Sequence, residues 1–196
     1  MIDQLRDRLR DVGFTVDGVF ALLGADAHHA LARNETTPAR RATRDGSPLA
    51  TLVRLFQLQL AVPREDVERA LPGLVDAMAG EGLVELSGAE VRALVDVRPY
   101  GDETHDWWVV ADLTPGLDQR PIEVGSDHVL GISEASNSLA QLTRREPVVR
   151  ALDLGTGCGV QALHLATHAA DVVATDVNPR ALWAARLTAA LNGVSV

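Results

Sequence analysis

Residues 148–192 alternate apolar, β-branched segments with amphipathic ones, and few folds accommodate this order. The pattern predicts a strand at 148–154, a glycine-rich loop, a helix at 160–169, a strand at 171–177 and a helix at 179–192. Two parallel strands need a long crossover between them, and that crossover is usually a helix. The C-terminal part is therefore predicted to be α/β, the beginning of an open parallel sheet.

The loop between the first strand and helix carries the most informative residues. It reads DLGTGCG over 153–159, with glycines at 155, 157 and 159. Glycines let the chain turn sharply and let a ligand approach the backbone, and the free amides of the next helix point at the same ligand. Asp176 follows Gly155 by about 20 residues, a spacing at which a carboxylate binds the hydroxyls of an adenosine ribose. The loop therefore predicts a site for a nucleoside cofactor.

Composition excludes several other chemistries. All 18 basic residues are arginine, so a lysine Schiff base and a phosphate-binding loop with its lysine are both excluded. The dinucleotide fingerprint needs a third glycine where this chain has Val160, which disfavours a nicotinamide oxidoreductase. The net charge of −9 argues against a broad nucleic-acid surface.

Cysteine and histidine usage gives no metal or disulfide signal. The single Cys158 forms no intramolecular disulfide and is interpreted as a small loop filler in a reducing compartment. His164 and His168 have metal-ligand spacing but lack a third ligand, so they are predicted to be surface residues of a helix, and no metal site is expected. No signal peptide or long apolar run occurs, which predicts a cytoplasmic protein without a membrane segment.

The N-terminal part combines short helices with a β-hairpin. Helical patterns cover 2–24 and end at Gly24, and Ser47 before Pro48 caps a helix predicted over 48–60. Two further short helices are split by Pro72, and strands are predicted at 83–86 and 91–97. This order is typical of an α+β winged-helix-like domain, a shape that serves DNA readers, protein docking units and dimerisation domains alike.

Two further segments have a structural and a functional interpretation. The stretch 33–48 is predicted to be a mobile basic loop that is either solvated or in contact with RNA phosphates through Arg33, Arg40, Arg41 and Arg44. In the strand predicted at 107–113, Trp107 and Trp108 face opposite sides, so one belongs to the core and the other is a candidate for stacking on a base. A turn-rich link follows at 115–121.

These segments define three parts: a recognition domain at 1–100, a connecting segment and lead-in to the cofactor site at 101–147, and the α/β part at 148–196. The segments DLGTGCG and ATDVNPRAL resemble motif I and the acidic strand end of class I S-adenosylmethionine-dependent methyltransferases. The likeness is to the "methyltransferase small domain" group, which includes release-factor glutamine methyltransferases and ribosomal RNA methyltransferases. DHVLGISEASNSLAQL resembles the lead-in helix that covers the cofactor in that group, and DETHDWWVVADL resembles actinobacterial members with an extra N-terminal domain.

The resemblance implies S-adenosyl-L-methionine as the cofactor on a Rossmann-like sheet. It places Gly155, Thr156 and Gly157 along the methionine portion and Asp153 at the amino group. It also places Asp176 at the ribose. The implied cofactor-binding set, which includes the adenine-edge residues, is Asp153, Gly155, Thr156, Gly157, Gly159, Asp176, Val177 and Asn178. Asn178 before Pro179 also has a purely structural interpretation as a helix cap.

The resemblance also implies what the sequence lacks. Members of the group carry an Asn- or Asp-Pro-Pro-aromatic motif after the fourth strand, and the sequence stops where a third strand would begin, at Val194. We therefore expect an incomplete sheet with no catalytic residue of its own, inactive alone and prone to dimerise. The expected partner is a release-factor-like protein or an RNA. The alternatives are a small-molecule methyltransferase with an N-terminal dimerisation domain and a winged-helix binding protein without catalysis.

Overall fold

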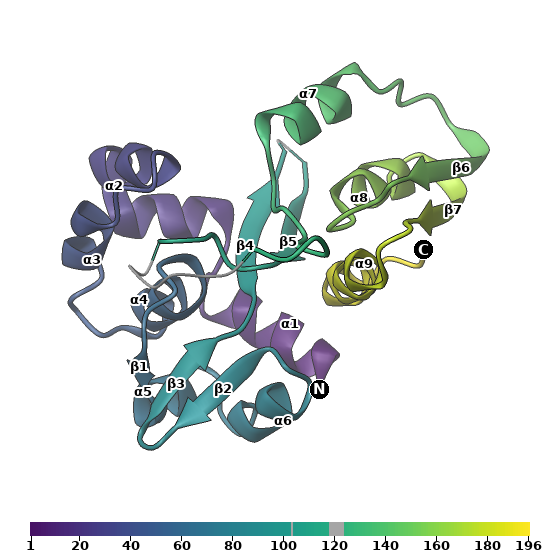
Figure 1. The fold of residues 1–196 in the computed structure, drawn as a ribbon. Helices are drawn as coiled ribbons and strands as arrows, with labels where there is room; N and C mark the ends of the chain where they lie inside the picture. The colour runs from purple at the N-terminus through teal and green to yellow at the C-terminus, as the bar shows by residue number, and fades with distance from the viewer. Residues whose placement is uncertain (103, 118–123) are drawn as a thin grey trace. The chain divides into compact units, whose positions relative to one another are not determined.

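The computed structural model describes residues 1–102, 104–117 and 124–196, and these form two compact units. Unit 1 contains Met1–Trp107 and Leu113–Ile122, and unit 2 contains Trp108–Asp112 and Glu123–Val196. Figure 1 shows the helices and strands of both. Most of the turn-rich link predicted at 115–121 lies outside the described residues.

Unit 1 begins with helices that bury an apolar core. The first two are α1 (Ile2–Asp11) and α2 (Val16–Ala32), and Gly24 interrupts α2 with φ 72° and ψ 165°. The predicted stop at Gly24 is therefore a break after which the helix resumes. Leu5 and Leu9 of α1 are buried with Phe14, whose ring centroid lies 6.2 Å from that of Phe56.

The basic segment after α2 was predicted to be a loop. It instead contains a short helix, α3 (Thr37–Ala42). Pro38 occupies the first turn of α3, where a missing amide costs nothing, and Ala39 is fully buried. The arginines of this segment therefore extend from a short packed helix and its flanks.

The helix predicted over 48–60 is shorter and changes geometry part-way. Ser47 caps it as predicted, its side chain accepting a hydrogen bond from the amide of Ala50. α4 (Pro48–Leu52) then passes into a π-helix, η1 (Val53–Gln57). The amide of Leu58 donates to the carbonyl of Val53 at 2.9 Å, a five-residue step that widens the last turn and ends the helix early.

The remainder of unit 1 is a small antiparallel sheet with two helices before its hairpin. α5 (Arg64–Ala70) and α6 (Val75–Gly80) lie on either side of Pro72, as predicted. β2 (Val84–Ser87) and β3 (Glu90–Ala93) pair in register Val84 with Ala93, and β1 (Val62–Pro63) adds to the other edge of β3. The hairpin is confirmed, whereas the assignment as a winged helix stays a prediction.

The strand predicted at 91–97 is in fact two strands. β3 ends at Ala93 and β4 (Asp96–Gly101) begins after a break in which the amide of Leu94 donates to the carbonyl of Leu83. β5 (Asp106–Ala111) follows, and the chain passes from unit 1 to unit 2 between Trp107 and Trp108. Both tryptophans are buried, at 7% and 2% exposed, so neither is an open stacking surface.

Unit 2 contains the predicted β-α-β-α order. Its elements are α7 (Glu134–Leu142), β6 (Val148–Leu154), α8 (Val160–Ala166), β7 (Ala169–Thr175) and α9 (Pro179–Asn192). β6 and β7 are parallel (Figure 1), and Leu152 lies opposite Val173 in their register. The α/β prediction for this part is therefore confirmed, although α8 ends three residues earlier than the sequence pattern suggested.

Polar side chains of α9 attach that helix to β5. The amide of Trp108 donates to Asn192 Oδ1 at 2.9 Å, and Asn192 Nδ2 donates to the carbonyl of Trp108 at 2.8 Å. Thr188 Oγ1 accepts from the amide of Val110 at 3.0 Å. These side chains satisfy backbone groups of β5 as a neighbouring strand would, because a buried amide or carbonyl without a partner is costly.

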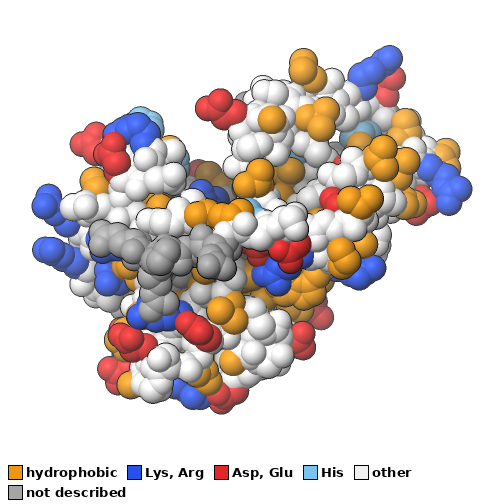
Figure 2. Space-filling model, in the orientation of Figure 1, with side chains coloured by type: hydrophobic (Ala, Val, Ile, Leu, Met, Phe, Trp, Pro, Cys, Tyr) orange, Lys and Arg blue, Asp and Glu red, His pale blue; other side chains and the backbone are white. Residues whose placement is uncertain are grey.

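One face of the β6–β7 pair is apolar and exposed. Leu152, Leu154 and Val173 alternate with residues that face the helices, and they are 61%, 82% and 44% exposed. Hydrophobic side chains also reach the surface around these strands in Figure 2. No helix in the described part of the chain is long and apolar enough to cross a membrane.

Candidate functional site

A cavity of about 440 Å³ opens at the carboxyl ends of β6 and β7, entirely within unit 2. In open parallel sheets ligands bind at this edge, because the loops that leave the strands surround it. The cavity is lined by Asp153, Gly155, Thr156, Gly157, Asp176 and Asn178, which are all but two of the residues implied by the sequence. Segments before β6 supply a further part of the lining: His128, Val129, Leu130, Gly131, Ser133, Ala135, Ser136 and Leu139.

The amides of four residues of the glycine loop donate to acceptors within the protein, so they do not bind a ligand; the predicted role of the amides of the helix that follows stays a prediction. The amides of Gly155 and Thr156 both donate to the carbonyl of Thr175, at 2.8 and 2.9 Å. The amide of Gly157 donates to Asp176 Oδ2 at 3.0 Å, and that of Gly159 to the carbonyl of Thr156 at 2.9 Å. Hydrogen bonds to the end of β7 therefore fix the conformation of the loop. These loop amides shape the site and do not serve as donors to a ligand.

That shape depends on missing side chains. A Cβ built on Gly155 or Gly157 would meet nothing within 4 Å, so the space beside these residues is open. Both have positive φ, at 77° and 55°, a conformation that favours glycine. A ligand can therefore lie directly against the backbone here.

Two carboxylates lie at this open side of the loop. Asp176 accepts from two backbone amides, Gly157 at Oδ2 and Asn178 at Oδ1, the latter at 2.9 Å. Asp153 is 9% exposed and accepts from Thr156 Oγ1 at 2.6 Å. A carboxylate has about four lone-pair positions, so Asp176 keeps acceptor capacity for a ligand's hydroxyl groups.

The other two residues of the implied set lie elsewhere. Gly159 has φ 84°, and a Cβ there would lie 3.0 Å from Cα of Ala185, so this glycine allows α8 and α9 to approach closely. Val177 is fully exposed and does not line the cavity. Asn178 lines the cavity and also caps α9, because its side chain accepts a hydrogen bond from the amide of Arg180. The position therefore agrees with both interpretations of this residue.

Parts of both units are similar to known families. Residues 130–196 match the family model described as methyltransferase small domain, whose members generally use S-adenosylmethionine. Residues 130–196 form a class I methyltransferase-like region. Residues 11–94, in unit 1, match a domain of unknown function (DUF7059), and no curated protein matches the chain.

An ion pair that the sequence did not reveal positions one wall of the methyltransferase-like region's cavity. Arg180 donates to Asp112 Oδ1 through Nε at 2.9 Å and Nη2 at 2.6 Å, a two-point contact of the kind that fixes geometry. Asp112 Oδ2 accepts from the amide of Val129 at 2.8 Å, and the Asp112 amide donates to the Val129 carbonyl. Nothing in the local sequence links Asp112 to Arg180, because the contact is made by the tertiary fold.

Two further side chains attach the same walls. Asn178 Nδ2 donates to the carbonyl of Asp127 at 2.8 Å, and Gln161 Nε2 donates to the carbonyl of Ser136 at 2.7 Å. α7, which contains Ser136, lies within the segment for which the resemblance predicted a lead-in helix. The segment 127–131 and α7 are therefore held beside the glycine loop by side chains of α8 and of the turn before α9.

Replacing Asp112 by Ala is expected to loosen the segment at 128–131. Asp112 is 16% exposed on its side chain, so its loss leaves the Val129 amide without an acceptor away from solvent. Hydrogen exchange at that amide should accelerate at least about tenfold. Asp171→Ala is the matched control, since Asp171 pairs with Arg150 on an exposed part of β7 and contributes little. Equal exchange in both variants would contradict the positioning role of Asp112.

The Asp176 carboxyl should titrate at unusually low pH. The backbone amides of Asn178 and Gly157 hold the pKa of Asp176 below its ordinary value, because they stabilise the charged form. The stabilisation that these hydrogen bonds give the folded chain is therefore fully present above the unfolded-state pKa of about 3.9. It is lost as pH falls through the lower folded-state pKa of Asp176. A ¹³C titration of the Asp176 carboxyl should give a midpoint below the ordinary value of about 3.9. A midpoint at or above that value would contradict the assignment.

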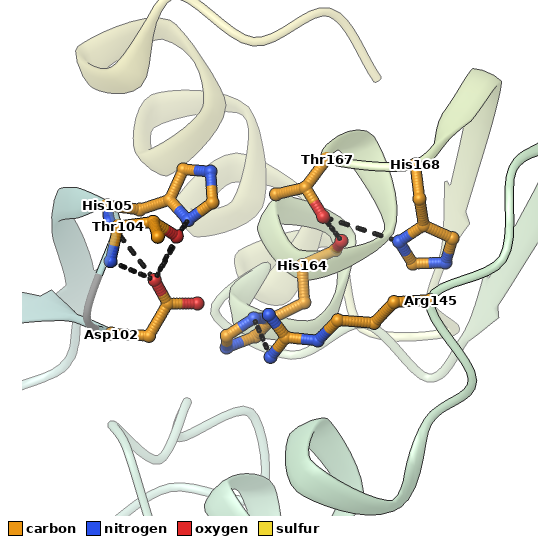
Figure 3. Close-up of polar contacts among 7 residues, drawn as sticks. All are labelled: Asp102, Thr104, His105, Arg145, His164, Thr167 and His168. Atoms are coloured by element: carbon orange, nitrogen blue, oxygen red, sulfur yellow. Dashed lines mark hydrogen bonds and ion pairs between the residues drawn. The ribbon is translucent and has the colours of Figure 1, made fainter.

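His164 and His168 do not form the surface pair that the sequence predicted. α8 ends at Ala166, so His168 lies beyond the helix. His164 is 3% exposed, and its Nδ1 lies 3.4 Å from Nη2 of Arg145 (Figure 3). Among the residues that the structure describes, no group of His, Cys, Asp or Glu is arranged to hold a metal ion. Cys158 is buried within the loop.

A hydroxyl, a histidine and a carboxylate also lie together in unit 1. They stabilise a turn and do not have the geometry of a catalytic triad. Thr104 Oγ1 and Asp102 Oδ1 lie 2.7 and 2.9 Å from the same atom, Nδ1 of His105 (Figure 3). A catalytic triad instead uses opposite ring nitrogens for its hydroxyl and its carboxylate. Asp102 Oδ1 also accepts from the amides of Thr104 and His105, so the cluster closes the turn after β4.

Proposed function

We propose that this protein is an S-adenosylmethionine-dependent methyltransferase that methylates a nitrogen of a protein glutamine or of an RNA base. The observation that carries the proposal is the cavity at the ends of β6 and β7, where Asp176 lies beside an open glycine loop. The family match of the same residues, 130–196, supports it.

The residues of this cavity fit the cofactor. Asp176 retains lone pairs for the two ribose hydroxyls, and Asp153 supplies negative charge for the amino group of the methionine part. The open space beside Gly155 and Gly157 leaves room for the part of the cofactor that joins the ribose to the methionine amino group. Asn178, which lines the cavity after the strand end, is proposed to lie at the adenine edge, and the exposed Val177 beside it is proposed to border that edge from outside the cavity.

The protein's own contribution to methyl transfer is position and the exclusion of water. The bound cofactor supplies a methyl group on a sulfonium, a centre that reacts by in-line displacement and depends on orientation. Val129 is 3% exposed and lines the cavity, and α7 presents Leu139 to the same space. These apolar side chains, held by Asp112 and Gln161, limit water around the reacting groups.

A transfer assay tests the proposal and separates the classes of acceptor. The chain is incubated with methyl-tritiated S-adenosylmethionine and, separately, with ribosomal RNA, a release factor or a mixture of small metabolites. Label in the release factor or the RNA, and none with Asp176→Ala, would support the proposal and contradict the expectation that residues 1–196 are inactive alone. Label only in the small molecules favours a small-molecule methyltransferase. No transfer to any acceptor together with no binding of S-adenosylmethionine would contradict the proposal.

A further inference from the structure

Unit 1 contains a cavity of its own, and all of its lining residues belong to that unit. Its volume is about 210 Å³, and its walls come from both parts of α2, from the end of η1 and from β4. Val19 and Leu31 give it an apolar side, whereas His28, Gln57 and Arg98 give it a polar one. A concave apolar site with a few convergent polar groups is the usual form of a small-ligand site.

One polar group at this cavity lacks a hydrogen-bond partner in the part of the chain that the structure describes. The Nδ1 atom of His28 is shielded from solvent and makes no hydrogen bond. Gln57, which is 5% exposed, is a second polar residue of the same cavity. Buried polar groups are nearly always hydrogen-bonded, and an exception needs an explanation such as a missing ligand.

Arg98 provides a fixed cation at the same cavity. Its Nη2 donates to Asp96 Oδ2 at 2.7 Å, and the side chain of Asp96 is only 8% exposed, so the pair anchors the guanidinium. A guanidinium has five N–H donors. Since Asp96 engages only Nε and Nη2, donors remain for a second acceptor.

The backbone around Gln57 departs from regular geometry in the same place. Gln57 is the last residue of the π-helix η1, and Gln59, two residues later, has a positive φ of 55° while being 4% exposed. Single π turns occur often at functional sites, where they change the direction of a side chain. Because of the π turn, the helix ends with Gln57 at the cavity wall, a position that a regular α-helical turn would not give it.

We propose that this cavity binds a small organic carboxylate with a short aliphatic part. The carboxylate accepts hydrogen bonds from Arg98 and from the amide nitrogen of Gln57, and the aliphatic part lies against Val19 and Leu31. The volume is below the roughly 300 Å³ of the smallest typical ligand pockets, which limits the ligand to a few carbon atoms beyond the carboxylate. The proposal is independent of the methyltransferase function, because all the lining residues belong to unit 1.

The test uses two probes of equal shape, 3-methylbutanoate and its neutral amide, 3-methylbutanamide. The whole ¹⁵N-labelled chain is titrated with each and followed by amide chemical shifts. We expect the carboxylate to shift the amides of Val19, His28 and Gln57 with saturation, and the amide probe to bind at least about tenfold more weakly. Equal binding of both probes, no saturation, or shifts confined to other residues would overturn the proposal.

Two variants and a control locate the binding. Gln57→Leu keeps the side chain's size and removes its donor, so carboxylate affinity should fall at least about tenfold. Val19→Phe fills the cavity and should abolish carboxylate binding. If Gln57→Leu does not fold, Val19→Phe alone tests whether the ligand binds in this cavity. Gln4→Leu is the same change at an exposed position of α1 and should bind as the native chain does. Unchanged binding in Val19→Phe would place the ligand elsewhere and end the proposal.

Discussion

Replacing Asp176 by Ala should weaken the binding of S-adenosylmethionine by about 100-fold. Each hydrogen bond to a charged group contributes about 1.5–3 kcal/mol, and the proposed contacts with the ribose hydroxyls depend on this carboxylate. The substitution also frees the amide of Gly157, which now donates to Asp176 Oδ2. Equilibrium dialysis with radiolabelled cofactor measures the effect.

Two controls separate lost contacts from lost structure. Asp171→Ala changes the same residue type within β7, the strand that Asp176 follows, at an exposed position that does not line the cavity, and should leave the affinity unchanged. Asp176→Asn keeps an acceptor oxygen without the charge and should fall between the native chain and Asp176→Ala. If Asp176→Ala bound the cofactor as tightly as Asp171→Ala does, the ribose role of Asp176 would be wrong.

Replacing Gly159 by Ala should destabilise unit 2 by about 2–5 kcal/mol. A left-handed residue with a Cβ costs about 1–2 kcal/mol, and inserting a methyl group into a packed interface costs about 1–3 kcal/mol. Both apply, because Gly159 has φ 84° and its added Cβ would lie 3.0 Å from Cα of Ala185, a residue that is 3% exposed. Denaturant unfolding of the whole chain, followed by circular dichroism, measures the change.

Gly155→Ala is the matched control for that prediction. Gly155 has nearly the same φ, 77°, yet an added Cβ would meet nothing within 4 Å. Its substitution should therefore cost only the conformational part, about 1–2 kcal/mol. Equal destabilisation by the two substitutions would show that α8 and α9 do not pack closely at Gly159.

Local signals in the sequence were reliable where a few adjacent residues determine the structure. Ser47 and Asn178 cap their helices as expected, because the capping contact spans only two or three residues. The β-α-β-α order of unit 2 follows from the alternation of strand and helix patterns. The cavity collects Asp153, Gly155 and Asp176 because parallel strands end at one edge.

The errors arose where distant residues or backbone alternatives decide. The sequence did not show that the carbonyl of Thr175 accepts two loop amides, because only the pairing of β6 with β7 brings that carbonyl close. The pair of Asp112 with Arg180 depends on the same tertiary fold. η1 was missed because a π turn has almost the same apolar pattern as an α turn. His164 was placed at the surface because helical spacing does not show what covers a helix.

Calorimetric titration of the native chain with S-adenosylhomocysteine, the demethylated cofactor, tests the central claim most directly. NADH, titrated in parallel, shares the adenosine but requires the glycine spacing that Val160 interrupts. We expect one molecule of S-adenosylhomocysteine to bind per chain and NADH to give no binding heat. Absence of S-adenosylhomocysteine binding, or equal binding of NADH, would contradict the assignment of the unit 2 cavity to this cofactor.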